Sequence, residues 1–504
     1  MKHYDHIVVG SGISGLTATL LLALQGKRVL LIEKAPAIGG SVARFRRGQV
    51  PFDTGFHFTG GFCEDGHGLL DDMLKVLGIR GEVSPVFLDE EGCHRIAFPS
   101  LGQIHEVPRG VDRYREKLKA DFPSERAGID GFFDKLLHVC RQTSSMDVAR
   151  LGETPQMLEE DYATLQEVLD SLIRDKVLQA LLSVFCICHG SKPSEISFAN
   201  HCRVAFGLYE ATARVKDGGD AFVSAFERAF HRLGVEVRCR TTIASLADIV
   251  DDRAGRFVLS DGEDVSADSC ILTIHPSEIV ALLPASHAKP AFRARVREYE
   301  PSIGIFGLFG TLADGTDGIH DNKAVFSIFP DTDVNRMMTP SSCTGPLPMV
   351  LIQSRERASD GRDVNTLTAL EVSFFEQVAT WEHTGIGRRG PAYEAYKAER
   401  ARDLQVRIEE YFPAFGRDFT QIATASMLTF RDYLNVPLGA AYGIRQKVGQ
   451  FNLIGKLPVL NLHAAGQSAI LPGIVGAMMS AFFVCRGVLG RQPFQNFIET
   501  RLAR

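Results

Sequence analysis

The chain of 504 residues has one tryptophan, and its ten cysteines form no framework of repeated spacings. Disulfide stapling is therefore not expected, and a reducing cytoplasm fits best. The 55 basic and 61 acidic residues give a net charge of -6 without a long block of one sign. This balance disfavours a nucleic-acid partner, because nucleic-acid-binding domains usually carry a concentrated basic surface.

Uninterrupted apolar runs long enough to cross a bilayer are also missing. The stretch from 470 to 489 is apolar but contains Pro472 and Arg486, and the apolar N-terminal stretch contains a glycine turn and continues to Glu33. A spanning helix needs about 20 consecutive apolar residues, and a signal peptide has an apolar core without such a turn. The sequence therefore predicts neither.

What the chain does have is a complete nucleotide-binding unit at residues 5–34. Residues 6–9 are typical of a strand, residues 14–24 of a helix, and Glu33 ends a second strand about 20 residues beyond the turn. The G-x-G-x-x-G positions are filled by Gly10, Gly12 and Gly15. Glycines let the backbone approach a pyrophosphate, the helix N-terminus favours the anion, and the carboxylate accepts from a ribose hydroxyl. The unit predicts a bound dinucleotide.

The length and the later pattern predict a discontinuous domain. An amphipathic helix is expected after Gly218-Gly219, with apolar positions from Phe222 to Leu233 and an end at Gly234. Strands at 235–239, 256–259 and 270–274 are expected to follow and to return to the first sheet. We therefore predict an α/β fold with a Rossmann-like nucleotide-binding domain at 1–79, 216–284 and 421–504, and an inserted α+β substrate domain at 80–215 and 285–420. Residues 354–365 are polar and are expected to form an exposed loop.

Three further segments decide which dinucleotide is expected. Gly39-Gly40 follows the acid closely, FDTGFHFTGG comes next at 52–61, and NLHAAGQSAILPGIVGAMMS lies at 461–480. In these segments the chain resembles the flavin amine oxidase and phytoene desaturase superfamily, where they go with FAD. FDTGFHF, TFRDYLNVPLGAAYG at 429–443 and Gly466-Gln467-Ser468 look most like the carotenoid isomerase and retinol saturase branch. Gln467 replaces the acidic residue usual in the desaturases, which favours the saturase-like side.

The resemblance implies a set of FAD-binding positions. They are Gly10, Ser11, Gly12, Ser14 and Gly15 for the pyrophosphate, Glu33 with Lys34 for the ribose, Val237 for the adenine, Gly40 and Ser41 along the cofactor, Gly466 and Gln467 for the ribityl-pyrophosphate, and Ile474 and Val475 beside the ring. Two alternatives stay open: Val237 could be a core strand residue, and Ile474 and Val475 could belong to a buried helix.

The implied activity is that of an FAD-dependent oxidoreductase on carbon-carbon double bonds of a hydrophobic polyene or isoprenoid, carotenoid-like or retinoid-like, of saturase or desaturase type. A flavin-dependent cis-trans isomerase is the first alternative. A flavin amine oxidase would need an aromatic cage for its cationic substrate, and the sequence shows no obvious one. A prenyl-lipid escort protein that makes no use of flavin would have no reason to keep the phosphate-approach glycines. The electron partner is unidentified, and peripheral contact with a membrane stays open.

Saturation needs a proton as well as a hydride, and three side chains are candidates to supply it. His57 lies in the flavin-facing loop, Tyr442 in the AAYG turn, and His463 at the end of an apolar strand. Each could equally be a structural hydrogen-bonding residue, and flavin and water alone could suffice. Four phenylalanines indicate either a long apolar tunnel or a phenylalanine-rich core: Phe306, Phe309, Phe326 and Phe329.

A metal site is not expected. Cys186, Cys188 and Cys202 are the nearest thing to a cysteine cluster, and His189 follows the second of them. However, C-x-C lacks the usual C-x-x-C pair of a zinc site and follows an apolar helical run. We therefore expect buried thiols at these positions.

Overall fold

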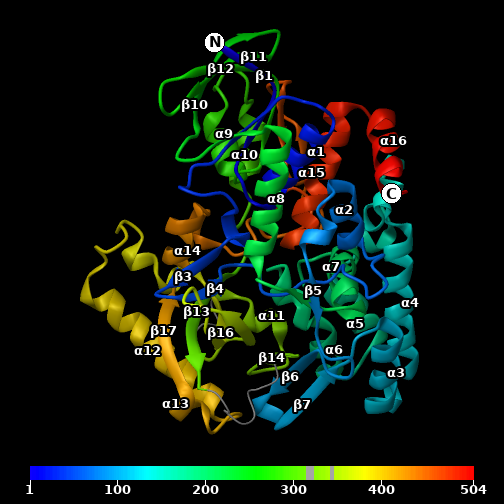
Figure 1. Cartoon of the computed structure of the whole chain (residues 1–504). Coiled ribbons are helices and arrows are strands. Elements are labelled where there is room, and N and C mark those ends of the chain that lie inside the picture. Colours follow the sequence, from blue (N-terminus) through cyan, green and yellow to red (C-terminus); the bar gives the residue numbers. More distant parts are fainter. Residues whose placement is uncertain (314–322, 341–344, 504) are drawn as a thin grey trace.

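The computed structural model describes residues 1–313, 323–340 and 345–503. Within them the chain forms two large sheets, one in the upper and one in the lower half of Figure 1, with helices around both. The predicted α/β class with a Rossmann-like nucleotide-binding part is confirmed by this arrangement.

The first sheet contains the N-terminal unit and has the order β10-β11-β12-β1-β2-β9, with β19 beside β12 and β18 beside β19. Its strands are β1 (Lys2–Val9), β2 (Val29–Ile32), β9 (Glu236–Arg238), β10 (Ile243–Val250), β11 (Arg253–Leu259), β12 (Asp264–Leu272), β18 (Gly455–Lys456) and β19 (Leu462–Ala464). The pairs β1-β2, β1-β12, β2-β9 and β12-β19 are parallel. The carboxyl ends of these strands therefore share one edge, where open parallel sheets bind nucleotides.

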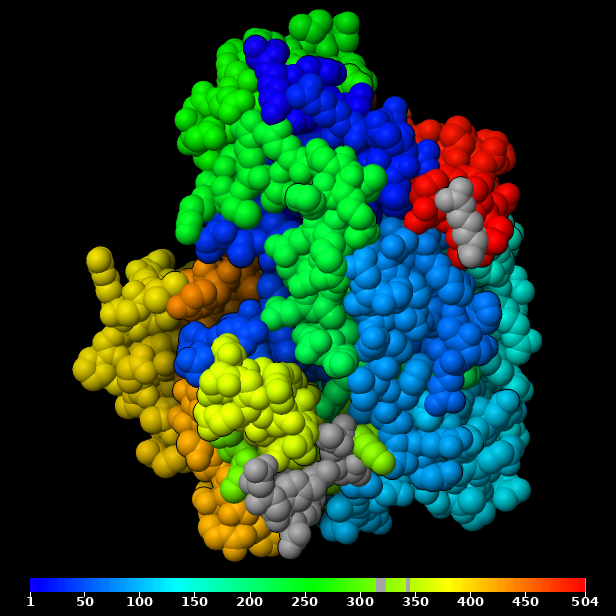
Figure 2. All heavy atoms as spheres, viewed as in Figure 1, coloured from blue at the N-terminus to red at the C-terminus, as the bar shows by residue number. Residues whose placement is uncertain are grey.

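Segments far apart in the sequence build this sheet, and Figure 2 shows the blue N-terminal segment directly against the green segment that contains β10–β12. Helices α1 (Ile13–Leu24), α8 (Gly219–Leu233) and α15 (Gly473–Leu489) share one apolar core with it. Eleven of the twelve residues of α1 are buried, because α15 and α8 cover the faces of this helix that the sheet leaves uncovered. Around them lie α2 (Leu69–Leu77), α9 (Pro276–Leu282), α10 (Pro290–Arg297) and α16 (Arg491–Leu502).

The second sheet has the order β17-β13-β16-β15-β14-β6-β7. Its strands are β6 (His94–Phe98), β7 (Gln103–Val107), β13 (Gly304–Leu312), β14 (Val325–Ile328), β15 (Met349–Arg357), β16 (Asp363–Ser373) and β17 (Phe419–Ala425). Two ribbons stand apart: β3 (Arg44–Arg47) with β4 (Val50–Asp53), and β5 (Pro85–Phe87) with β8 (Ala213–Val215). The second sheet is thus assembled from the two segments that the sequence assigns to a substrate domain, and β17 reaches across the predicted boundary at 421.

A helical layer packs beside the second sheet, on the right of Figure 1. It consists of α3 (Val111–Asp121), α4 (Arg126–Gln142), α5 (Leu165–Leu172), α6 (Lys176–Ser183), the short 3-10 helix η8 (Val184–Cys188) and α7 (Phe198–Glu210). The remaining helices with more than one turn of α-structure in the described chain are α11 (Val334–Met337), α12 (Gly390–Glu409), α13 (Phe415–Asp418) and α14 (Met427–Leu434). We call the helices α3–α7 with η8 the helical lobe.

Two expectations from the sequence are corrected. The segment 354–365 is not one exposed loop, because β15 and β16 pair through Arg357 and Asp363 and leave only the short turn between them. The tunnel interpretation of the four phenylalanines is also wrong for three of them, since Phe306, Phe309 and Phe329 are fully buried core residues. Phe326 is partly exposed and packs against Tyr411 and Phe412.

No helix in the described part of the chain combines the length and the apolar character needed to cross a membrane.

Candidate functional site

The glycine turn between β1 and α1 is as tight as the motif requires. Gly10 has a φ of +94°, and a Cβ there would lie 2.8 Å from Thr273 Oγ1. A Cβ on Gly15 would lie 1.8 Å from the carbonyl oxygen of Gly10. A Cβ on Gly12, in contrast, would meet nothing within 4 Å. The outer two glycines therefore permit the turn, while Gly12 leaves open space in front of the first turn of α1.

A buried carboxylate holds this turn at the end of β2. Glu33 accepts hydrogen bonds from the Ser11 amide at 2.8 Å, the Ser11 hydroxyl at 2.5 Å and the Ala35 amide at 2.7 Å. The Gly39 amide donates in turn to the Ser11 hydroxyl at 3.2 Å. Lys34 is exposed. Glu33 thus stands beside the glycine turn with its position fixed by backbone donors, as a ribose-binding acid must.

The double-glycine loop lies against the same turn. A Cβ on Gly40 would lie 3.2 Å from the Gly12 Cα, and the φ of +54° at Gly40 is a further reason for glycine. Gly40 and Ser41 are exposed, and the Ser41 carbonyl accepts from the Gly55 amide at 3.0 Å. The loop therefore forms one continuous surface with the turn.

A serine pair ties the C-terminal segment to the N-terminal unit. The hydroxyls of Ser14 on α1 and Ser480 on α15 lie 3.0 Å apart, and the Gly466 amide donates to the Ser480 hydroxyl at 2.9 Å. The Cys485 thiol also bonds to the Ala18 carbonyl, so the two helices run in parallel. Since Ser480 is seven residues into α15, that helix extends roughly 10 Å beyond the start of α1.

Both helices begin without a side-chain cap. The N-cap residues are Gly12 for α1 and Pro472 for α15, and neither supplies a side-chain acceptor. The first amides of a helix then need another partner, and an anionic group suits them. At the start of α15, Gly473 is exposed, and a Cβ there would meet nothing within 4 Å. The two helix ends thus offer one anion site at the glycine turn and a second about 10 Å further along.

The remaining predicted cofactor residues lie around these ends. Val237 on the edge strand β9 is 37% exposed, so the alternative that it is a core residue is wrong. Ile474 is buried and Val475 is partly exposed, so the buried-helix alternative holds for Ile474 only. Gln467 is partly exposed, and its side chain lies about 3.4 Å from the position of a Cβ on Gly443.

His57 and Tyr442 lie deep in the molecule yet keep exposed surface. Burial, with the Arg214 and Arg44 guanidinium groups, lowers the pKa of His57 to about 3. Burial also raises the pKa of Tyr442 well above its usual range, and its backbone amide donates to Ser302 Oγ at 2.9 Å. Both side chains are only partly covered by protein atoms. Each is therefore uncharged at neutral pH.

Cys188 is a third residue that is neutral and partly exposed. The sequence had predicted only a buried thiol at this position. Burial raises its pKa to about 12, although the residue is partly exposed. It packs at the margin of the helical lobe's core together with Phe58 and Tyr442. The neighbouring Gly190 leaves no room for a Cβ, which would lie 2.8 Å from the Tyr442 ring. Only the fold brings these distant residues together, so no sequence spacing points to them.

His463 does not belong to this site. It lines a surface pocket of about 580 Å³ with His6, Lys456 and the C-terminal residues of α15. Because the candidate cofactor end of α15 is Gly473, His463 lies roughly 20 Å away along that helix. Burial, with Lys456 nearby, lowers the pKa of His463 to about 4. A role for His463 as proton donor is therefore not supported.

A buried ion cluster joins the two halves of the site. Arg44 on β3 lies 3.0 Å from Asp53 on β4 and 2.6 Å from Glu356 on β15. Burial raises the pKa of Asp53 to about 6, which Arg44 opposes. Asp53 also accepts from the Gly219 amide at the start of α8. Sequence reasoning missed this cluster, whose one visible signal is the Asp of the FDTG segment.

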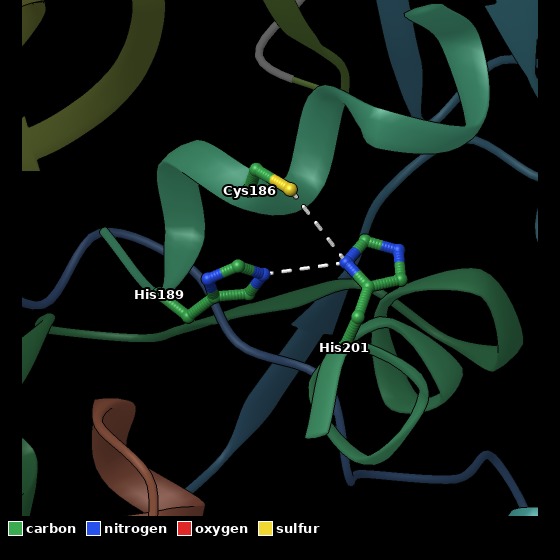
Figure 3. A group of neighbouring side chains, drawn as sticks. All are labelled: Cys186, His189 and His201. Atoms are coloured by element: carbon green, nitrogen blue, oxygen red, sulfur yellow. Dashed lines mark hydrogen bonds between the residues drawn. The ribbon is translucent and has the colours of Figure 1, made fainter. Parts of the chain in front are cut away.

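The helical lobe contains a second polar cluster, shown in Figure 3. His189 Nε2 lies 3.2 Å from His201 Nδ1, and Cys186 Sγ lies 3.9 Å from the same nitrogen. All three residues are fully buried. The expectation of no metal considered Cys186, Cys188 and His189 without His201. Cys188 lies outside the cluster.

These observations define a dinucleotide-binding α/β protein with a second lobe over the carboxyl edge of its parallel sheet. The model of the flavin containing amine oxidoreductase family matches residues 13–336, and the chain belongs to that family. The predicted superfamily is thereby confirmed, and so is FAD as the cofactor. The open space at Gly12, the uncapped helix ends and the exposed Val237 all fit FAD.

Known proteins of this kind resemble the chain, some over nearly all of its length and some over part of it. All-trans-retinol 13,14-reductase of Macaca fascicularis is 24% identical over 98% of this chain and 86% of its own. Prolycopene isomerase of Daucus carota is 32% identical over 33% of this chain and 27% of its own. The structure of an oxidoreductase from Methanosarcina mazei has a TM-score of 0.64 and 15% identity, covering 95% of this chain and 99% of that one. The last similarity concerns the fold.

Proposed function

We propose that this flavoenzyme reduces a carbon-carbon double bond of a hydrophobic polyene or isoprenoid, of retinoid or carotenoid type. Bound FAD supplies hydride chemistry at its ring nitrogen. The single observation that carries the proposal is a set of partly exposed side chains that are neutral at pH 7 beside the helical lobe: Phe58, His57, the Cys188 thiol and the Tyr442 phenol. The full-length similarity to a retinol reductase supports the same substrate class.

The same side chains oppose an amine substrate. The pKa of His57 falls to about 3 chiefly because burial penalises its charged form. A protonated amine placed beside His57 would suffer the same desolvation and the repulsion of Arg44 and Arg214. The Asp53 carboxylate is already paired with Arg44. A neutral polyene suffers no such penalty. We therefore place the amine oxidase alternative behind the double-bond reductase.

In this proposal the two predicted proton donors, His57 and Tyr442, act while they are uncharged. His57 can offer its neutral N–H as a hydrogen bond, and Tyr442 its O–H, but neither is a strong acid at neutral pH. We therefore propose that the two side chains orient the reacting end of the substrate, and that solvent water delivers the proton. Water must then reach the site when the substrate is bound.

A cis-trans isomerase is the second candidate function, favoured by the stretch of 32% identity to a prolycopene isomerase. Isomerisation would use the same neutral side chains without net consumption of electrons. Product mass separates the two reactions, because reduction adds two hydrogens and isomerisation adds none.

The electron partner, a cytoplasmic location and a peripheral membrane contact also remain proposals. A polyene substrate partitions into bilayers, so the enzyme would collect it at a membrane surface. Co-sedimentation with lipid vesicles, with and without loaded carotenoid, tests that contact directly.

The test begins with the visible spectrum of the purified protein before and after FAD is added. The holoprotein is then reduced anaerobically with dithionite, freed of excess reductant, and mixed with all-trans-retinol or a carotenoid. We expect reoxidation of flavin with one equivalent of a product two hydrogens heavier. A product of unchanged mass selects the isomerase. Reduction of oxidised flavin by putrescine selects the amine oxidase, and a missing flavin band selects the escort protein.

A further inference from the structure

The cluster in the helical lobe owes its geometry to two local structures. Cys186 lies in the 3-10 helix η8, and His189 follows directly as its C-cap residue. Residues three apart eclipse each other in a 3-10 helix, so their side chains point the same way. A C-x-x-H spacing in this conformation therefore presents a thiol and an imidazole side by side.

The third member comes from the first turn of α7. His201 sits on the buried face of that helix with Phe198, Cys202 and Ala205. Ser197 caps the helix, and its carbonyl accepts from the His201 amide at 3.0 Å. His201 Nδ1 is thereby directed at both His189 and Cys186, as Figure 3 shows.

The separations within the cluster match those of ligands around one ion. A tetrahedral zinc ion with Zn–N of about 2.0–2.1 Å and Zn–S of about 2.3 Å sets neighbouring nitrogens roughly 3.3 Å apart, and sulfur and nitrogen roughly 3.6 Å apart. The corresponding distances are 3.2 Å and 3.9 Å, and all three ligand atoms lie within 4.8 Å of one another. The largest separation between two ligand atoms, at most 4.8 Å, would have to shorten by up to about 1.2 Å to fit this geometry.

We propose that Cys186, His189 and His201 bind a zinc ion inside the helical lobe. Two imidazole nitrogens and one thiolate are donors of the kind that zinc prefers, and three protein ligands leave a fourth position for a small ligand. The site is separate from the flavin and supplies no step of the proposed reduction.

A hydrogen-bonded imidazole pair is the competing explanation. Without an ion, His189 donates from Nε2 to His201 Nδ1, while His189 Nδ1 accepts a long bond of 3.4 Å from the Ser191 amide. Zinc binding moves the proton of His189 to Nδ1, replaces the hydrogen bond between the two imidazoles and gives up the long bond from the Ser191 amide. In exchange it gives His189 Nε2, His201 Nδ1 and Cys186 Sγ one common partner in a largely apolar core.

The ion would staple η8 to α7 next to the neutral side chains of the proposed site. Cys188 ends η8, and Gly190 packs against the Tyr442 ring. An ion that holds this turn in place would also hold Cys188 and Tyr442 in place beside the proposed substrate. The ion would therefore have a positioning role. The inference stands on the cluster alone, so it survives if the proposed reductase activity fails.

The test is metal content of the FAD-loaded protein, measured by mass spectrometry after zinc loading and gel filtration in metal-free buffer. We expect close to one zinc per flavin in the wild type, and at least a tenfold loss in Cys186→Ser and His201→Gln. The matched control is Cys202→Ser, which removes a buried thiol beside His201 without touching the cluster. It should retain the full zinc content.

Cobalt provides the second readout, because a thiolate ligand gives bound Co²⁺ an intense near-ultraviolet absorption. This band should develop in the wild type and in Cys202→Ser, and be absent from Cys186→Ser with FAD content unchanged. If the cluster variants do not fold, the wild type decides: failure to take up either ion overturns the proposal and leaves the imidazole pair. Equal zinc in the Cys186 and Cys202 variants also overturns it.

Discussion

We propose that Glu33 performs two tasks through one carboxylate. It holds the glycine turn by accepting from the amides of Ser11 and Ala35, and in the proposal it also binds the ribose of FAD. Hydrogen bonds to a charged acceptor contribute about 1.5–3 kcal/mol each. The residue therefore links the shape of the turn to the affinity for the cofactor.

We expect Glu33→Ala to weaken FAD binding roughly 30-fold, the equivalent of about 2 kcal/mol. The measurement is quenching of flavin fluorescence on titrating the apoprotein. Glu263→Ala is the control, because it removes an exposed carboxylate that bonds Arg238 on β9 and lies away from the turn. An unchanged dissociation constant for Glu33→Ala would show that the carboxylate does not contact the cofactor.

The pKa of His57 leads to a prediction about how the rate of polyene reduction depends on pH. With its pKa lowered to about 3 it stays neutral throughout the range from pH 5 to 8. His57→Gln keeps an N–H donor, so we expect a rate of polyene reduction within about tenfold of the wild type and a pH profile of the same shape. Loss of a step near pH 6.5 in the variant would mean that His57 titrates during the reaction and donates its proton.

At the scale of whole elements, the site depends on how α1, α15 and the Gly466 turn are joined. The Ser480 hydroxyl accepts from the Gly466 amide, donates to the Ala477 carbonyl at 2.7 Å and meets Ser14. Removing it leaves a buried amide without a partner, which costs about 1–3 kcal/mol.

Ser480→Ala should therefore lower both the thermal midpoint and the FAD affinity, the latter by about tenfold. Ser171→Ala is a matched control, since Ser171 also bonds the carbonyl three residues earlier in its helix but lies far from the cofactor. Equal FAD affinity in the two variants would mean that this hydroxyl does not position the flavin site.

The elements that sequence predicted best are those specified locally. The β1–α1–β2 unit follows from glycine spacing and apolar periodicity within 34 residues, and the helix at 219–233 ends at Gly234 as expected. The β15–β16 hairpin was missed because the paired ends of its strands, such as Arg357 and Asp363, are polar and exposed like the residues of a loop. His201 was missed for a related reason, since twelve residues and a change of helix separate it from His189.

At the scale of the whole molecule, buried histidines set the response to acid. Burial lowers the pKa of His57 and His94 to about 3, and of His201, His275 and His463 to about 4. An unfolded histidine has a pKa near 6.5. Below that pH the unfolded chain takes up protons that the folded chain refuses, so stability falls as pH falls from 6.5 towards 4. Asp53 acts in the opposite sense, because its raised pKa of about 6 favours the folded state as pH falls from 6 to about 4.

His94→Gln isolates one of these contributions. The imidazole Nε2 bonds Thr212 Oγ1 at 2.9 Å, and a glutamine amide can replace that donor without titrating. In the wild type each such histidine makes the free energy of unfolding drop by about 1 kcal/mol per pH unit between pH 6 and 5. We therefore expect the slope of urea-unfolding free energy against pH, measured at saturating FAD, to be smaller by about that amount in His94→Gln. His383→Gln, which changes an exposed histidine, is the control for the substitution itself. If the two variants give equal slopes, His94 takes up protons in the folded state, and the acid sensitivity must come from groups other than His94.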